Sequence, residues 1–272
     1  MNDTTTNAKK IIDFHTHIWP DAIALRAATS IGDYYSIPIE GDGTAAMLTS
    51  HIPEGWDVRF VISSATLKPK NAQKGNDFLL ECAKNDSRFI PFSSVHPDMG
   101  DLECAKELER TKALGAKGIK LHPDFQHIFI DGENMNEIYR CCSELDLPIL
   151  FHVGDRNTEY TTPVRLYRIM DKFPNLKVVA AHMGGYSVWE EAEKHLIGTN
   201  VFMDSSETFQ YMPVEKVYEL IKRHGVDKVF FGSDFPVRCT DTEFADFEKL
   251  PFTAEEKEQM YHLNAEKFLG LN

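Results

Sequence analysis

Short apolar runs alternate with amphipathic stretches along the whole chain, and this alternation predicts strands and helices in turn. The first apolar run begins at Ile11, and the last one ends at Gly232. The predicted strands cover residues 11–17, 58–64, 89–95, 116–121, 149–152, 176–181, 201–204 and 229–232. Strands that alternate with helices form right-handed βαβ units with a parallel sheet, and eight such units close into a barrel.

The stretches between the strands have the length and periodicity of helices. The predicted helices cover residues 44–52, 76–84, 102–114, 135–145, 163–173, 188–196, 213–224 and 241–249. A final helix follows Thr253, where Glu256 completes a capping box, and is broken near Asn264. We therefore predict an α/β fold, a single-domain (β/α)8 TIM barrel over residues 1–272, because such barrels commonly have roughly 250 residues. An open doubly wound sheet is the alternative, but the segment after the first strand lacks its glycine-rich turn.

Residues 19–43 connect the first strand to the first predicted helix and are rich in Gly, Asp, Pro and aromatic residues. This composition predicts a long loop. Long loops in compact domains are usually functional, so this segment is a candidate lid over whatever the first strand binds. A surface excursion without a function remains the alternative.

The net charge of −13 opposes binding to nucleic acid or to an anionic membrane, and no basic cluster offsets it. No run of 18 apolar residues is present, so we expect a cytoplasmic protein without a membrane span. The five cysteines show no CxxC spacing and are expected to be reduced thiols.

Two histidines, His15 and His17, end the first predicted strand. Because side chains alternate along a strand, both imidazoles leave on the same face. Two neutral imidazoles on one face form half of a metal site, since zinc favours nitrogen ligands at about 2.0–2.1 Å.

Three other predicted strands also end in side chains that can bind a metal: His152 on strand five, His182 on strand six and Asp234 on strand eight. A single histidine at a strand end is usually a core or loop residue whose ring nitrogens are hydrogen-bonded. In a barrel, however, the carboxyl ends of all strands meet at one mouth. Burying so many polar groups together is costly unless a metal ion or a hydrogen-bond network satisfies them.

These motifs, in this order, resemble the amidohydrolase superfamily, and specifically the amidohydrolase-2 group that includes aminocarboxymuconate-semialdehyde decarboxylase and related hydrolases. The resemblance rests on the His-Thr-His of strand one, on His152 and on the segments 118–123 (Gly-Ile-Lys-Leu-His-Pro), 181–185 (Ala-His-Met-Gly-Gly) and 232–236 (Gly-Ser-Asp-Phe-Pro). It covers essentially the whole chain.

The resemblance implies one divalent metal ion, zinc or alternatively manganese, bound by His15, His17, His152 and Asp234. It also implies that His182 is a catalytic acid or base and that Asp234 handles the proton of a metal-bound water. Three imidazoles and one carboxylate leave room for such a water, whose pKa the metal lowers to roughly 7.

Four further residues are candidates for substrate binding: Trp19, Lys120, Arg156 and Arg238. Lys120 shares strand parity with His122, so it points into the barrel. It is either a free ammonium that favours an anionic substrate or, as in some amidohydrolases, a carboxylated lysine that bridges a second metal ion. Each arginine follows a ligand-bearing strand, where a guanidinium can hold a substrate carboxylate through two hydrogen bonds.

Our main prediction of function is hydrolysis of a small carboxylated amide, lactone or ester by the metal-bound water. The alternative is metal-dependent, non-oxidative decarboxylation of an aromatic or enolic acid, which would use the same ligands. Two further alternatives are a TatD-like deoxyribonuclease, which carries a glutamate where this chain has Lys120, and a barrel that only binds. The expected partner is a small organic acid, without nucleic acid or membrane, and a homodimer is left open.

Overall fold

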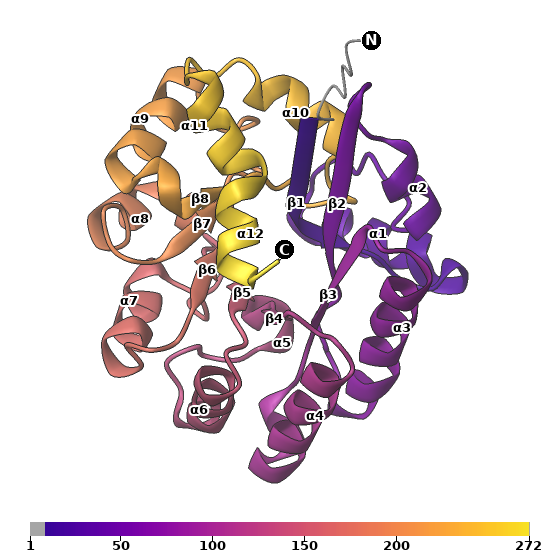
Figure 1. Cartoon of the computed structure of the whole chain (residues 1–272). Helices are drawn as coiled ribbons and strands as arrows, with labels where there is room; N and C mark the ends of the chain where they lie inside the picture. Colours follow the sequence, from indigo (N-terminus) through magenta and orange to yellow (C-terminus); the bar gives the residue numbers. More distant parts are fainter. Residues whose placement is uncertain (1–8, 272) are drawn as a thin grey trace.

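The computed structural model describes residues 9–271 and shows eight parallel strands arranged as a barrel (Figure 1). The strands are β1 (Lys9–His17), β2 (Trp56–Ser63), β3 (Phe89–Ser93), β4 (Gly118–Leu121), β5 (Ile149–Phe151), β6 (Val178–Ala180), β7 (Phe202–Asp204) and β8 (Val229–Phe230). Each strand pairs with the next in sequence. The backbone N–H of Phe14 donates to the carbonyl oxygen of Phe231 at 2.9 Å, which joins the end of β8 to β1. The predicted TIM barrel is confirmed.

Helices surround the strands in the predicted order. They are α2 (Ala45–Ser50), α3 (Ala72–Asn85), α4 (Asp101–Ala113), α5 (Pro123–Gln126), α6 (Asn136–Glu144), α7 (Pro163–Lys172), α8 (Trp189–His195), α9 (Val214–His224), α10 (Thr240–Phe247), α11 (Ala254–Glu258) and α12 (Asn264–Leu269). The predicted capping box of Thr253 and Glu256 is present, and a π-helical segment (Gln259–Leu263) separates α11 from α12. No helix within the described residues is long and apolar enough to cross a membrane.

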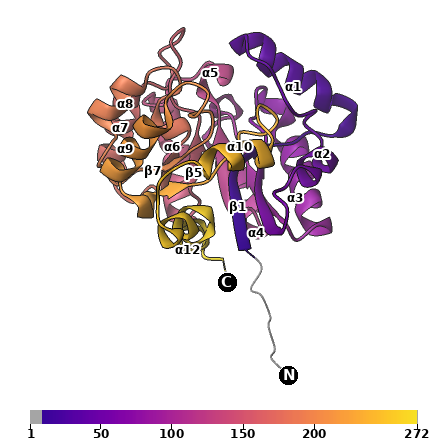
Figure 2. The same cartoon turned by 90° about the horizontal axis from the view of Figure 1, so that it is seen from above.

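The segment predicted as a loop, residues 19–43, is largely helical, so that prediction was wrong. Helix α1 (Asp21–Tyr35) spans fifteen of its residues. The alanines of this stretch favour a helix, and Ala24, Ala28 and Gly32, spaced four residues apart, form its buried face. Figure 2 shows α1 at one end of the barrel and α12 at the other.

Apolar side chains from the strands fill the barrel interior next to α12. The cluster consists of Ile12, Phe14, Val61, Ile90, Phe92, Leu150, Val179, Ala181 and Phe230, with Ala265, Phe268 and Leu269 of or beside α12. The rings of Phe14 and Phe230 stack with their centroids 4.2 Å apart. This cluster packs the strands below the polar strand ends, which fixes the positions of those ends.

The first strand carries an irregularity that matters for the site. Its register against β2 shifts between Asp13 and Thr16. Such a shift changes the direction of a side chain within a strand. As a result, Phe14 packs in the interior cluster while the next residue, His15, also faces the barrel interior and contacts Lys120.

We predict that Phe14→Ala lowers the free energy of unfolding by about 3–5 kcal/mol, because it removes a fully buried ring from the interior cluster. Leu102→Ala, at an exposed position on α4, should change it by less than about 0.5 kcal/mol. Chemical denaturation of both variants measures the difference. Equal effects at the two positions would contradict the role given to the cluster.

Candidate active site

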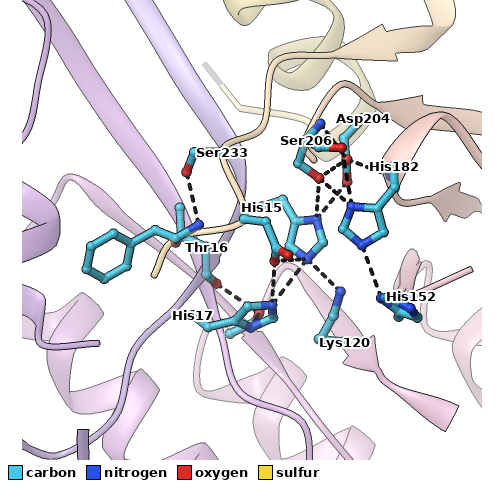
Figure 3. A network of polar contacts seen from close by, with 12 residues as sticks. His15, Thr16, His17, Lys120, His152, His182, Asp204, Ser206 and Ser233 are labelled. Carbon is cyan, nitrogen blue, oxygen red and sulfur yellow. Dashed lines mark hydrogen bonds and ion pairs between the residues drawn. The ribbon is translucent and has the colours of Figure 1, made fainter. Parts of the chain in front are cut away.

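Six side chains from five strands of the barrel meet at its carboxyl-terminal mouth. Figure 3 labels His15, His17, Lys120, His152 and His182 among them. They are His15 and His17 on β1, Lys120 on β4, His152 directly after β5, His182 two residues after β6 and Asp234 after β8. The five basic side chains are buried, and the side chain of Asp234 is 14% exposed. All the predicted metal ligands therefore lie in one place.

Three potential metal-binding atoms are in mutual contact. The Nε2 atoms of His15 and His17 lie 3.2 Å apart, and Oδ1 of Asp234 lies 3.1 Å from each of them. Ligands at about 2.1 Å from a tetrahedral ion lie about 3.4 Å from one another. The observed spacing is close to that of a first coordination shell.

The second nitrogen of each β1 histidine is held by a neighbouring strand. Nδ1 of His15 donates to Oγ of Ser206 at 3.1 Å and lies 3.0 Å from Oδ2 of Asp204, at the end of β7. The hydroxyl of Ser63 donates to the carbonyl oxygen of Thr16 and accepts from Nδ1 of His17 at 3.0 Å. These bonds place the proton of each ring on Nδ1, so both Nε2 lone pairs face the site.

In the other two histidines, too, a neighbouring group holds one ring nitrogen and the other nitrogen faces the site. Nε2 of His152 donates to the carbonyl oxygen of Gly154 at 2.9 Å, which leaves the Nδ1 lone pair free. Nδ1 of His182 faces Oγ of Ser206 at 3.0 Å, while the Ser206 hydroxyl itself donates to Asp204. Nδ1 of His152 and Nε2 of His182 then approach each other to 3.1 Å.

This donor set fits a divalent metal ion. The pKa values of His15, His17 and His182 lie well below their usual value, and that of His152 falls to about 3, mainly because burial disfavours the charged ring. Neutral imidazoles with converging lone pairs are the form that binds a metal, and they repel one another without a cation. His15, His182 and Asp234 have ligand atoms within 4.8 Å of one another, so His182 also lies within reach of the same ion.

A buried lysine and a buried carboxyl group share the centre. Nζ of Lys120 lies 2.7 Å from Nε2 of His15. Burial lowers the pKa of Lys120 and raises that of Asp234, and the charge of each group opposes the shift of the other. The mouth therefore holds a positive group next to the ligand atoms, where an anion can bind.

Several residues around the mouth have backbone conformations that L-residues rarely adopt. His182 has a φ of 59°, and Asp234 also has 59°. Gly154 has a φ of 90°, and a Cβ atom there would lie 2.6 Å from the carbonyl oxygen of Tyr186. Such strain occurs mostly where surrounding structure enforces a functional geometry.

A small cavity of about 30 Å³ adjoins these groups. It is lined by His17, Ile31, Tyr35, Ile37, Lys120, His122, Phe125, His152, His182, Tyr186, Glu207, Asp234 and Val237. A pocket of about 380 Å³ on the outer side shares His17, Ile31, His122 and Phe125 with it. The outer pocket has the size that small-molecule sites usually have.

The predicted substrate-binding residues lie in different surroundings. Lys120 lines the inner cavity, and Trp19 lines the outer pocket. Arg156 is exposed and lines a separate surface groove, and Arg238 is ion-paired with Glu243 and Asp246. Neither arginine lines the inner cavity or the outer pocket.

Three residues of the site were not predicted from the sequence. Asp204 ends β7, but nothing in the sequence indicated that it would lie beside His15. Tyr35 lies in the segment predicted as a loop, and its hydroxyl lies 3.2 Å from Nε2 of His122 and 3.3 Å from Nε2 of His152. Glu207 follows the polar residues after β7, and only the turn there brings it to the cavity.

The family model described as Amidohydrolase, of the amidohydrolase-2 type, matches residues 12–271. The chain belongs to the amidohydrolase-2 family. It is thus an enzyme of the amidohydrolase superfamily, as the motifs predicted.

The chain is also similar to named proteins. It is 24% identical to a gamma-resorcylate decarboxylase of Polaromonas sp. over 263 residues, covering 78% of this chain and 79% of the relative. It is 24% identical to decarboxylase orsB of Emericella nidulans, covering 73% and 76%. The crystal structure of dihydroxybenzoic acid decarboxylase from Polaromonas sp., with manganese and 2-nitroresorcinol bound, matches with a TM-score of 0.72 at 19% identity, covering 97% and 98%.

These relatives overturn our main prediction of function. We predicted hydrolysis of an amide, lactone or ester, but both sequence relatives and the matched structure are named decarboxylases. The sequence could not separate the two reactions, because both use the same metal ligands.

We predict that Asp204→Asn weakens metal binding about 10- to 100-fold, because Asp204 holds the Ser206 hydroxyl that orients His15 and places its negative charge beside that ring. Asp124→Asn is the matched control: this buried carboxylate accepts hydrogen bonds from Thr158 and Thr161, not from a ligand histidine. Titration of the metal-free proteins with manganese measures both affinities. Equal affinity in the parent and Asp204→Asn would contradict the orienting role.

Proposed function

We propose that this protein is a metal-dependent, non-oxidative decarboxylase of a small aromatic acid. The observation that carries the proposal is that two pockets adjoin. The inner cavity is lined by convergent candidate metal ligands and Lys120, and the outer pocket has aromatic walls. The names of the relatives supply the reaction class.

The two spaces suit the two ends of such a substrate. The outer pocket is lined by the rings of Trp19, Tyr34 and Phe125, and by the aliphatic Ile31, which suit a flat apolar ring. The inner cavity offers the ammonium group of Lys120 to the carboxylate. We therefore infer that the ring lies in the outer pocket and that the carboxylate reaches inward past His17.

Decarboxylation breaks the bond between the ring carbon and the carboxylate carbon. The electron pair stays on the ring carbon, carbon dioxide leaves, and that carbon takes up one proton. A divalent ion at His15, His17, His152 and Asp234 supplies a positive charge that binds and orients the substrate anion. Lys120 holds the carboxylate from its own side, and the buried walls exclude water.

Either Asp234 or His182 was predicted to manage the proton. A carboxyl group that binds a metal ion is ionised, so Asp234 as a ligand is not a source of the proton. The ring of His182 lies within reach of the same centre and can pass a proton to the substrate. We therefore propose His182 as the group that delivers the proton to the ring carbon.

Manganese is the ion we propose, because the matched decarboxylase structure holds manganese. Zinc remains the alternative, since imidazole and carboxylate ligands suit both ions. We propose a single ion with Lys120 as a free ammonium, and the alternative is a carboxylated Lys120 that bridges a second ion.

We predict that the manganese-loaded protein releases carbon dioxide from at least one hydroxybenzoate, and that chelation abolishes the release. Adding manganese back should restore it, because the convergent imidazoles need a cation to hold the substrate anion. Quantifying carbon dioxide and the phenol product checks both steps. Release at an equal rate after complete chelation would contradict the metal requirement, and amide or lactone hydrolysis without any carbon dioxide release would contradict the reaction class.

We predict that Lys120→Met lowers kcat/KM about 10- to 100-fold, which corresponds to the loss of one charge-assisted hydrogen bond to the substrate carboxylate. Arg156→Ala should leave kcat/KM unchanged, because Arg156 lines a separate surface groove. Steady-state kinetics on the same acid compare the two variants, after metal content has been measured for each. A larger loss of kcat/KM in Arg156→Ala than in Lys120→Met would mean that Arg156, and not Lys120, binds the substrate carboxylate.

A further inference from the structure

Glu207 occupies an unusual position beside the candidate active site. It lies three residues beyond the end of β7 and has a φ of 53°, a left-handed conformation that is strained for a glutamate. Its side chain lines the inner cavity together with Lys120 and Asp234. The residue is only 2% exposed, so its carboxyl group is withdrawn from bulk water.

A buried carboxyl group normally has a cationic partner or several hydrogen-bond donors. Glu207 receives one side-chain hydrogen bond, from Nε2 of Gln210 to Oε1 at 3.0 Å. The nearby guanidinium of Arg238 is engaged by Glu243, at 3.2 Å, and by Asp246. Among the ion pairs of residues 9–271, none includes Glu207. Its carboxyl group therefore retains bonding capacity in the cavity.

The size of the cavity limits what can use this capacity. A volume of about 30 Å³ holds about two water molecules, so it admits small polar groups at the edge of a substrate but not an aromatic ring. If the ring lies in the outer pocket, the polar edge of the substrate is the part that reaches Glu207.

We propose that Glu207 binds the substrate directly, through a hydrogen bond with a hydroxyl group on the ring. This hydroxyl lies ortho or meta to the carboxylate. This inference rests on the proposed function and adds a residue that selects hydroxylated acids. The carboxyl group of Glu207 and the ammonium of Lys120 then engage two different groups on the same edge of the ring.

A hydroxyl group is the substituent that suits this carboxyl group best. Burial raises the pKa of Glu207 to about 8, with Asp234 adding to the shift. The carboxyl group is neutral or ionised depending on the pH and on the charge of a bound metal ion. A hydroxyl can both donate and accept, so it pairs with either form, whereas an apolar substituent would leave the carboxyl oxygen without a partner.

The test measures binding rather than turnover. Benzoate, 2-hydroxybenzoate and 3-hydroxybenzoate are titrated calorimetrically into the manganese-loaded parent protein, Glu207→Leu and Glu207→Gln. We expect one hydroxybenzoate to bind the parent at least tenfold more tightly than benzoate. Glu207→Leu should lose this gain and keep its benzoate affinity, while Glu207→Gln, which retains an acceptor oxygen, should keep most of it.

The outcomes separate this inference from the proposed function. If benzoate and both hydroxybenzoates fail to bind the parent protein, the aromatic-acid function and the role of Glu207 both fail. If benzoate binds but no hydroxyl adds affinity, or if Glu207→Leu weakens all three ligands equally, Glu207 does not contact the substrate and the proposed function stands. Metal content and circular dichroism are measured for every variant. If Glu207→Leu does not fold, Glu207→Asp, which withdraws the carboxyl group by one methylene, replaces it and should lose the hydroxyl preference.

Discussion

The constraint on which the site depends is the burial of four imidazole rings around one point. Each ring has two nitrogens, and a buried nitrogen without a partner is costly. The protein satisfies the outer nitrogen of each ring with a neighbouring group: Ser206 for both His15 and His182, Ser63 for His17 and Gly154 for His152. Because those bonds fix the tautomers, the inner lone pairs converge, which is the arrangement that suits a cation.

The barrel lowers the conformational entropy that is lost when these side chains are held in place. The apolar cluster around Phe14 and Phe230 fixes the strands, so the groups beyond it gain their positions without ordering a flexible loop. Local irregularities then direct single side chains. The register shift in β1 turns His15 inward, and His182 and Asp234 have left-handed backbone conformations. A regular core thus supports a strained rim.

The sequence was informative where a side chain projects directly from a strand. The apolar runs predicted all eight strands, and His15, His17, His152 and Asp234 could be expected at one mouth because parallel strands end on the same side. The sequence was less informative where a helix or a turn brings a residue to the site from a distant part of the chain. Tyr35 reaches His122 from the end of α1, a helix whose glycine and aromatic residues suggested a loop. Arg238 follows a ligand-bearing strand as predicted, yet its charge is taken up by Glu243 and Asp246.

The proposed substrate is an acid, although the protein is itself acidic. The pairing of the charged side chains around the cavity explains how the two are compatible. The net charge of −13 opposes an approaching carboxylate, and Arg238 is already paired with Glu243. Lys120 is different, because its burial at the end of a strand surrounded by neutral imidazoles leaves its ammonium facing the cavity. Its attraction acts over a short range in a poorly solvated space, where electrostatic interactions are stronger than in water. In the proposed function, the charge of the acid is therefore bound by Lys120 within the cavity, and the net charge of the protein has little effect on that contact.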